Sequence, residues 1–271
     1  MNILLLGDVM GRAGREAVAL HLPELRRLLD VDVAVVNAEN AAHGYGLTEK
    51  LCGVLHESGA DILTTGNHVW DQRELIQYID RDPRVLRPAN FPEGTPGAGW
   101  RLHPLDDGRR ALVVNLMGRL FMDLLDDPFA GLNAILAQCP LGAAVDAIVV
   151  DFHGEATSEK MAFGHFADGR VSAVIGTHTH VPTADAQILP GGTAYISDLG
   201  MCGDYDSVIG MQKAPSVRRF VTRMPGDKPQ PAEGEATVCG VFLVTDDATG
   251  LARRIEPVRV GGRLAACVPK P

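Results

Sequence analysis

The sequence predicts an α/β fold built from two sheets with mixed strand directions. Short apolar runs rich in Leu, Ile and Val recur along the chain, and each ends in a polar cluster. Most of the early runs are followed by a helical pattern, which is typical of parallel strands joined by crossover helices. The later runs follow one another without helices, which favours antiparallel pairing. We therefore expect a two-sheet α/β sandwich.

Six apolar runs are the candidate strands of the parallel part. In order they are NILLLGD (2–8), VDVAVVNAEN (31–40), ADILTTGNH (60–68), ALVVNLMG (111–118), DAIVVDFHGE (146–155) and VSAVIGTHTH (171–180). Apolar residues at helical spacing predict helices at 14–29, 48–59 and 72–80, with Pro23 a potential kink in the first. Three later runs are expected to be antiparallel, namely AYISD (194–198), TVCGVFLVTDD (237–247) and RRIEPVRV (253–260).

Three segments interrupt this pattern, and each is too short to form a domain. Residues 87–100 and 118–133 are predicted insertions between strands, suited to a lid or a subunit contact. Residues 223–235 are predicted to form a surface loop. The sequence contains no internal repeat or low-complexity tract. We therefore expect residues 1–271 to form a single domain.

Composition limits the classes of partner. The chain has 25 Lys and Arg against 34 Asp and Glu, and its net charge of −9 disfavours duplex nucleic acid. Its five cysteines are odd in number and lack a CxxC motif, which indicates reduced thiols and no zinc-thiolate site. The N-terminal run MNILLLGDVMGR is short and has no basic leader. We expect a cytoplasmic protein that binds neither duplex nucleic acid nor membrane.

Side chains able to bind metal follow five of the predicted strands. In an open α/β sheet, ligands bind outside the carboxyl ends of the strands. In VIGTHTHVPTAD (174–185), His178 and His180 are two positions apart, so in an extended chain they would lie on one face and reach the same point. The candidates at the five strand ends are Asp8, Glu39, Asn40, Asn67, His68, His153, His178 and His180.

Each candidate also has an ordinary structural explanation. Asp8 can cap the following helix, Asn40 can form an Asx turn, and His153 can be a hydrogen-bonded residue near the core. Five strands that all end in such residues favour a shared metal site instead. Carboxylate, amide and imidazole ligands without thiolate suit iron, manganese or zinc. So many ligands suit two ions about 3.5–4 Å apart with a bridging carboxylate, an arrangement that cleaves phosphoesters.

The order of these motifs resembles the calcineurin-like metallophosphoesterase superfamily. It consists of GD, a bridging acid, GNH, a lone His and finally HxH. The segments GDVMGRAGR, NAENAAHGYG, TTGNHVWDQ, DFHGEATSEK and GTHTHVPTAD are similar to those of its YmdB-like branch of bacterial phosphodiesterases. The resemblance extends from residue 2 to about residue 210. It implies a four-layer α-β-β-α sandwich that holds two iron ions, with manganese as a substitute.

The resemblance also implies a role for each site residue. The first ion would be held by Asp8, Asn40 and His180, the second by Asn67, His153 and His178, and the bridge would be Glu39. His68 would be the general acid that protonates the leaving oxygen. The alternative role for His68 is an orienting hydrogen bond.

Two positions depart from the wider superfamily. Met10 stands where a second ligand of the opening DxH motif is usual, and thioether is a poor ligand for a hard ion. Asn40 is the candidate replacement. Val69 follows GNH where an acid usually orients the histidine, and the first acid after it is Asp71. Whether Asp71 performs that role is left open by the sequence.

Three further features are weaker candidates for substrate contact. Residues 11–15 could approach a phosphate, although a plain strand-helix turn is the simpler interpretation. Lys160 belongs to an SEK cluster in which Ser158 can simply cap a helix. His43 lies in the glycine-bounded loop AHGYG, close in sequence to Glu39.

These observations predict a metal-dependent phosphodiesterase that hydrolyses cyclic nucleotides. By resemblance, 2′,3′-cyclic nucleoside monophosphates are the expected substrates, with a metal-bound hydroxide as the nucleophile and His68 as the acid. One alternative is a phosphomonoesterase or 5′-nucleotidase that uses the same site. Another is a nucleotide-binding regulatory protein with little turnover. The expected partner is a small phosphodiester, and the sequence leaves a homo-oligomer open.

Overall fold

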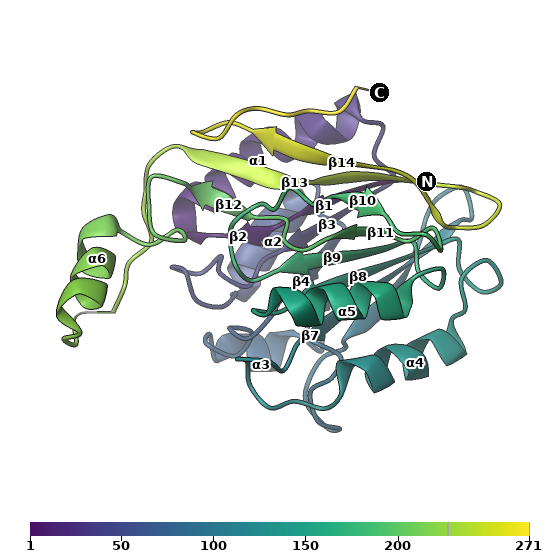
Figure 1. Cartoon of the computed structure of the whole chain (residues 1–271), viewed down its shortest axis with the longest axis horizontal. Coiled ribbons are helices and arrows are strands. Elements are labelled where there is room, and N and C mark those ends of the chain that lie inside the picture. Colours follow the sequence, from purple (N-terminus) through teal and green to yellow (C-terminus); the bar gives the residue numbers. More distant parts are fainter. Residues whose placement is uncertain (227, 271) are drawn as a thin grey trace.

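A computed structural model describes residues 1–226 and 228–270, which form four layers with two sheets in the middle (Figure 1). Three helices cover the outer face of the first sheet: α1 (Gly11–Leu28), α2 (Glu49–Glu57) and α3 (Glu74–Tyr78). Two helices cover the outer face of the second sheet: α4 (Pro128–Gln138) and α5 (Thr157–Ala167). The α-β-β-α sandwich of two mixed sheets is therefore confirmed.

The first sheet has eight strands in the order β2-β12-β13-β1-β3-β4-β5, with β14 paired to β13. Their bounds are β1 (Asn2–Leu6), β2 (Asp8–Val9), β3 (Val33–Asn37), β4 (Ile62–Thr64), β5 (Val85–Leu86), β12 (Met201–Asp204), β13 (Ala236–Thr245) and β14 (Ala252–Val260). Strands β1, β3, β4 and β5 are parallel, as the helical crossovers predict. Strands β13 and β14 are antiparallel, as the missing crossover predicts.

The second sheet has six strands in the order β10-β11-β9-β8-β7-β6. Their bounds are β6 (Trp100–Pro104), β7 (Arg110–Met117), β8 (Ala147–His153), β9 (Ala173–Thr177), β10 (Gln187–Ile188) and β11 (Ala194–Ile196). Residues 194–198 were predicted to pair antiparallel, and β11 does so with β10 but runs parallel to β9, so the prediction is right for one neighbour only. The edge strand β10 is antiparallel to β11 and reverses the chain between β9 and β11.

Alternating side chains of the central strands fill separate layers of the core. In β1, Ile3 and Leu5 pack between the two sheets, whereas Leu4 and Leu6 pack under the helices. Strands β3 and β8 alternate in the same way, so both faces of each sheet are buried. This burial fixes the register of the parallel strands and brings their polar carboxyl ends to one edge of the sandwich.

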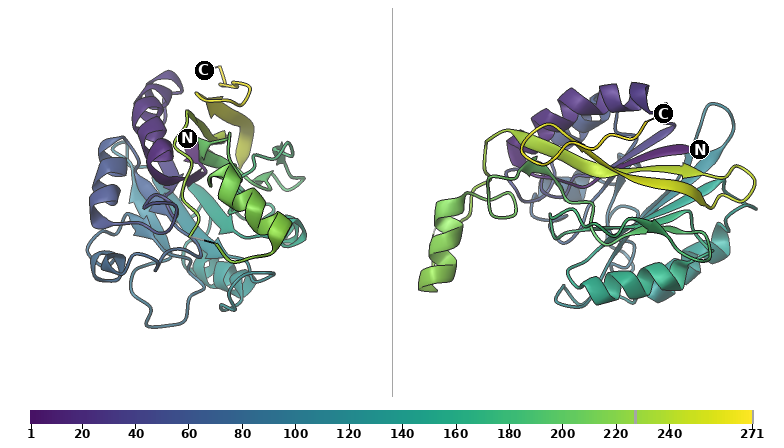
Figure 2. Two further views of the ribbon diagram at one scale, coloured as in Figure 1. Left: turned by 90° about the vertical axis from the view of Figure 1, so that its left-hand side faces the viewer. Right: turned by 45° about the horizontal axis from the view of Figure 1, so that its top comes forward.

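Helices differ from the sequence pattern in three places. Helix α1 begins at Gly11 rather than residue 14 and continues through Pro23, whose exposed ring lies on the solvent side. The predicted insertion at 118–133 contains the start of α4. A further helix, α6 (Lys213–Thr222), was not predicted and projects from the body (Figure 2). Within the described ranges, no helix combines the length and apolar character needed to cross a membrane.

Candidate metal centre

The predicted ligands converge at the carboxyl ends of the strands. Asp8 follows β1, Glu39 and Asn40 follow β3, and His153 is the last residue of β8. Asn67 follows β4, while His178 and His180 follow β9. Five of the seven side chains belong to buried residues, and the other two, Asn67 and His178, are half-buried. The structure thus brings together all seven residues that sequence and resemblance selected as ligands.

One group of donor atoms surrounds the imidazole of His153. Its Nε2 atom lies 3.2 Å from Oε1 of Glu39 and 3.1 Å from Nδ1 of His178. The same Nε2 atom lies 3.0 Å from Oδ1 of Asn67. These four residues are the ones that the resemblance assigns to the second ion and its bridge.

A second group of donor atoms surrounds Asp8. Ligand atoms of Asp8, Glu39 and His180 all lie within 4.8 Å of one another. Nε2 of His180 is 4.0 Å from Oδ1 of Asp8 and 3.2 Å from Oδ1 of Asn40. Glu39 belongs to both groups, which is the position that a bridging carboxylate occupies.

Two carboxylate oxygens show that the donor set fits a cation. Oδ1 of Asp8 and Oε1 of Glu39 are buried and accept no hydrogen bond. A buried oxygen of this kind is costly, since it has lost water, and the ring of His153 at 3.2 Å from Oε1 of Glu39 compensates only one of the two. Cations held between the two groups would satisfy both oxygens. The residues therefore fit a metal centre of oxygen and nitrogen ligands.

The pKa values in this centre are shifted by burial and by mutual attraction. Burial raises the pKa of Asp8 to about 7 and lowers that of His178 to about 3. Burial also opposes the charges on Glu39 and His153, but their attraction across 3.2 Å outweighs it. The pKa of Glu39 falls to about 2 and that of His153 rises to about 9. At pH 7 His153 is thus protonated, and a metal ion that binds its ring nitrogen would displace that proton.

Metal uptake is expected to release about one to two protons per chain at pH 7, because ligands must lose their protons to bind. The raised pKa values keep His153, and part of Asp8, protonated in the metal-free protein. Protons on these two residues compete with the metal ion less strongly as the pH rises. The affinity for metal should therefore increase between about pH 6 and pH 9. Calorimetric titration of Mn²⁺ in buffers of different ionisation enthalpy measures the release. A binding heat independent of buffer would contradict this prediction.

Residues outside the donor set hold two of the histidines in place. Nδ1 of His153 lies 2.8 Å from Oγ1 of Thr177, which donates to Oδ1 of Asp151 at 2.7 Å. Nδ1 of His180 lies 2.8 Å from the carbonyl oxygen of Ile209. Such partners fix the orientation of each ring, which leaves Nε2 free to bind a metal ion. Thr177 and Asp151 were not predicted from the sequence, although an aspartate inside the apolar run AIVVDFH was an available signal.

The two histidines of the HxH motif are not extended, which corrects the expectation that they share one face. Strand β9 ends at Thr177, and His178 and His180 have φ values of 100° and 66°. Lys160 lies buried beneath this turn and donates to the carbonyl oxygen of Thr177 and to Asp198. Lys160 therefore supports the turn, and it does not face the solvent where substrate would bind.

His68 lies beside the metal ligands at the protein surface. Its backbone N–H donates to Oε2 of Glu39 at 3.3 Å, and its Nδ1 lies 2.9 Å from Oδ2 of Asp71. The rings of Tyr45 and His68 pack in a T-shaped arrangement, with centroids 5.2 Å apart. The ammonium of Lys228 lies 4.0 Å from the centroid of Tyr45. Asp71 thus takes the orienting position left vacant by Val69, and Nε2 of His68 remains available.

The other sequence candidates occupy different surroundings. Met10 is buried and packs closely against Gly210. A Cβ atom added at Gly210 would lie only 2.4 Å from Cγ of Met10. Arg12 pairs with Glu16, and Arg15 donates to the carbonyl oxygen of Ala41. These contacts favour the plain strand-helix turn over a phosphate site at residues 11–15. His43 is exposed.

Gly66 leaves the space in which Glu39 and His153 meet. A Cβ atom at this position would lie 2.3 Å from both Oε2 of Glu39 and Nε2 of His153. Gly66→Ala should therefore remove at least half of the bound metal, although no ligand changes. Metal analysis of the purified protein measures this loss.

Gly53→Ala is the matched control, because a Cβ there meets nothing within 4 Å. It should keep the metal and stabilise α2 by about 1 kcal/mol. Full metal content in Gly66→Ala would show that Glu39 and His153 do not meet at a metal ion.

Comparison with known proteins decides the family. A family model described as YmdB-like protein matches residues 4–258. The chain belongs to this YmdB-like family. A protein from Bacillus subtilis, named 2′,3′-cyclic-nucleotide 2′-phosphodiesterase, is 47% identical over 260 residues, which cover 96% of this chain and 97% of that protein. A Mycoplasma genitalium protein named putative phosphatase/phosphodiesterase is 36% identical, with 96% of this chain and 93% of the relative covered.

Solved structures extend the similarity of this YmdB-like chain to three dimensions. A hypothetical protein from Thermus thermophilus has a TM-score of 0.90 at 42% identity, covering 97% of this chain and 100% of that one. A protein from Mycoplasma pneumoniae described as a novel phosphatase has a TM-score of 0.88 at 34% identity, covering 96% and 93%. The fold is thus shared along nearly the whole of each chain.

Proposed function

We propose that residues 1–271 form a single metallophosphoesterase domain that hydrolyses cyclic nucleotides, with 2′,3′-cyclic nucleoside monophosphates as substrates. The observation that carries the proposal is the shared position of Glu39 between two groups of buried ligands. Two ions in these groups, iron or manganese, would activate a water and neutralise the phosphoryl oxygens. The name of the Bacillus subtilis relative, 47% identical to this chain, supports the choice of substrate.

The protein's own residues would divide the remaining work. Asp8, Asn40 and His180 hold one ion in this proposal, and a second set of three residues holds the other. That set consists of Asn67, His153 and His178. His68 protonates the departing ribose oxygen through Nε2, because its Nδ1 is engaged by Asp71 at 2.9 Å. Tyr45 packs against His68 in a T-shaped arrangement.

A phosphomonoesterase remains the second candidate, because two relatives are named as putative phosphatase/phosphodiesterases. The same donor groups can hold ions for either reaction. The two activities differ in product, since a monoesterase releases free phosphate from a nucleotide whereas a cyclic phosphodiesterase opens the ring and leaves a monoester.

The deciding experiment combines metal analysis with a substrate screen. Protein purified without oxygen should contain about two transition-metal ions per chain, since seven ligands exceed what one ion uses. Cyclic nucleotides, nucleotide monoesters and aryl diesters are then compared at equal metal content. At most one ion, with activity unchanged when more is added, would contradict the two-metal site. Single-turnover cleavage too slow to compete with nucleotide release would instead support a regulatory protein.

A further inference from the structure

Helix α6 (Lys213–Thr222) projects from the body, and none of its residues is buried (Figures 1 and 2). The chain segments that lead into and out of the helix are joined by a backbone hydrogen bond, from the N–H of Gln212 to the carbonyl oxygen of Gln230 at 2.9 Å. We call residues 213–226 the arm. A helix of ten residues is marginal in water without tertiary contacts. The arm is therefore expected to pack against something outside its own chain.

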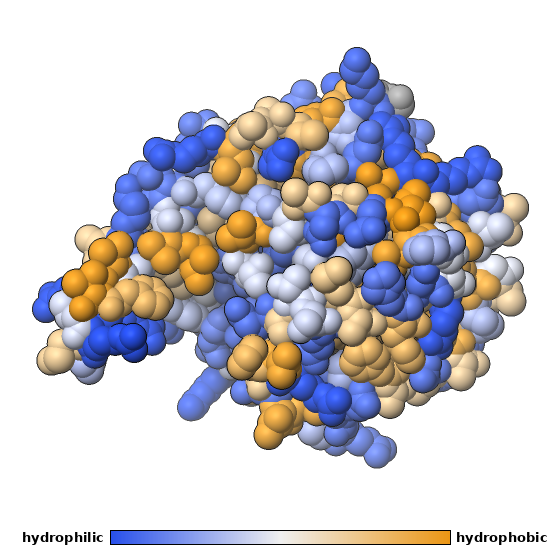
Figure 3. Space-filling view, viewed as in Figure 1, coloured by the Kyte–Doolittle hydropathy of each residue, from blue (hydrophilic) through white to orange (hydrophobic). Residues whose placement is uncertain are grey.

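The arm carries an apolar stripe next to basic side chains. Val217, Phe220 and Val221 are 53%, 73% and 76% exposed, and their helical spacing places them on one face of α6. Met224, 61% exposed, follows just beyond the end of the helix. Figure 3 shows this apolar material on the projecting helix at the left. Between Asp206 and Asp227 the sequence contains no acidic residue but four basic ones, which are Lys213, Arg218, Arg219 and Arg223.

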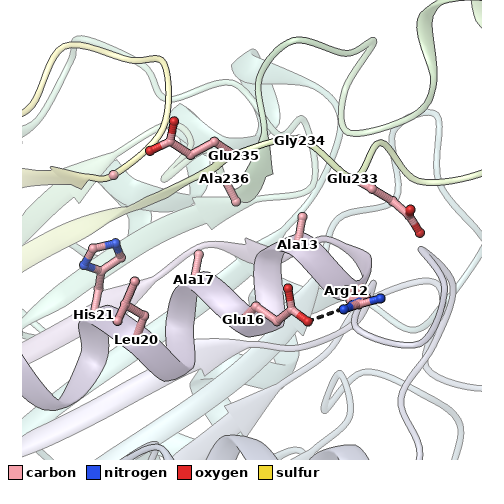
Figure 4. A pocket seen from close by; sticks show the side chains of 11 residues that line it. Arg12, Ala13, Glu16, Ala17, Leu20, His21, Glu233, Gly234, Glu235 and Ala236 are labelled. Carbon is pink, nitrogen blue, oxygen red and sulfur yellow. Dashed lines mark hydrogen bonds and ion pairs between the residues drawn. The ribbon is translucent and has the colours of Figure 1, made fainter.

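A groove elsewhere on the body has the opposite charge. It lies between α1 and residues 233–236, with a volume of about 400 Å³ (Figure 4). Ala13, Ala17 and Leu20 give it an apolar wall, and Leu20 is 70% exposed. Its acidic side chains are Glu16, Glu233 and Glu235. Among the described residues, neither Glu233 nor Glu235 is in an ion pair, whereas Glu16 pairs with Arg12.

We propose that α6 of one copy of this chain docks into the groove of a second copy. An amphipathic helix lying in an apolar groove is a common mode of recognition, and the basic arm and acidic groove add charge complementarity. The arm lies away from α1 of its own chain, so it leaves its own groove open (Figure 2). Each copy has one arm and one groove, so in a two-fold dimer the arm of each copy binds the groove of the other.

Two other binding partners for the arm, an anionic membrane and a different pocket on the body, are less well matched. An anionic membrane also suits a basic amphipathic helix, but it would leave the acidic groove without a partner. A pocket beside the 118–127 loop, lined by Arg119, Leu120, Ser158 and Glu159, has one acidic side chain, and that carboxylate already accepts from the backbone N–H groups of Arg119 and Leu120. Both alternatives give distinct results in the following test.

Charge reversal tests the contact without relying on any one variant. The arm variant carries Arg218→Glu and Arg219→Glu, and the groove variant carries Glu233→Arg and Glu235→Arg. The unmodified chain should dimerise at about micromolar concentration, and each variant alone should associate at least about tenfold more weakly. An equimolar mixture should dimerise again, because each reversed arm then meets a reversed groove and each unmodified arm an unmodified one. Analytical ultracentrifugation measures all four samples.

The control carries Asp123→Arg and Asp126→Arg on the 118–127 loop and should dimerise normally. Thermal unfolding and metal content verify that every variant is folded. The proposal is overturned by a monomeric unmodified chain, by an arm variant that still dimerises, or by a mixture that stays monomeric. It is also overturned if the loop control alone loses dimerisation. Binding of the unmodified chain to phosphatidylglycerol vesicles, without self-association, would assign the arm to membranes instead.

Discussion

Glu39→Gln is expected to lower the occupancy of both metal positions, with apparent affinity reduced by at least about 100-fold, more than is usual for a partner outside the ligand shell. The reason is that Glu39 is the one carboxylate in both groups of donor atoms, and its Oε1 is buried without a hydrogen bond. An amide supplies no charge to either ion. Metal analysis after equilibrium dialysis against Mn²⁺ or Fe²⁺ measures the occupancies.

Asn40→Ala is the matched comparison because Asn40 lies with the donor atoms around Asp8, where its Oδ1 is 3.2 Å from Nε2 of His180. It should weaken one ion and leave the other in place. Thermal unfolding of both metal-free variants tests whether the fold is intact. If Glu39→Gln bound two ions and turned over normally, the carboxylate would not bridge, and the assignment of ligands would be wrong.

The sequence located the candidate ligands at one edge of the sheet, but it did not predict the backbone geometry that presents them. Asp8, Glu39 and His153 stand directly at or after apolar strands, so their position at the sheet edge follows from strand order. The strand pattern could not reveal that His178 and His180 adopt positive φ values. That turn depends on Lys160, which is distant in sequence and reaches it through tertiary packing.

The fold shows the same division between local pattern and tertiary context. The apolar runs and helical crossovers predicted the parallel strands β1, β3 and β4, because burial on both faces leaves a continuous apolar signal. The antiparallel pairing predicted for β11 holds only with β10, and its parallel pairing with β9 was missed because the chain reverses in the two-residue strand β10, which is too short to show a pattern. Helix α6 has an amphipathic pattern, but its packing partner is not in the same chain if the proposed dimer is correct.

His68→Ala is expected to slow hydrolysis of a cyclic nucleotide by about 10²–10⁴-fold, the range that general acid catalysis typically supplies. His68 is suited to that role because it lies next to the ligand Asn67, and Asp71 engages Nδ1 and leaves Nε2 available. A ribose alkoxide leaves poorly without a proton, whereas nitrophenolate leaves readily. An aryl diester should therefore lose much less rate, and the ratio of the two losses is the quantity to measure.

Two controls distinguish general acid catalysis by His68 from its other possible roles. Asp71→Asn should give a smaller loss with the same substrate preference, because the ring keeps Nε2 but loses a charged partner at 2.9 Å. Metal content must be equal in all proteins, since the backbone N–H of His68 also contacts Glu39. Equal losses on both substrates with both ions bound would mean that His68 orients the phosphoryl group or the nucleophile. Loss of metal from His68→Ala would make it a ligand, and the division of roles around Glu39 would have to be redrawn.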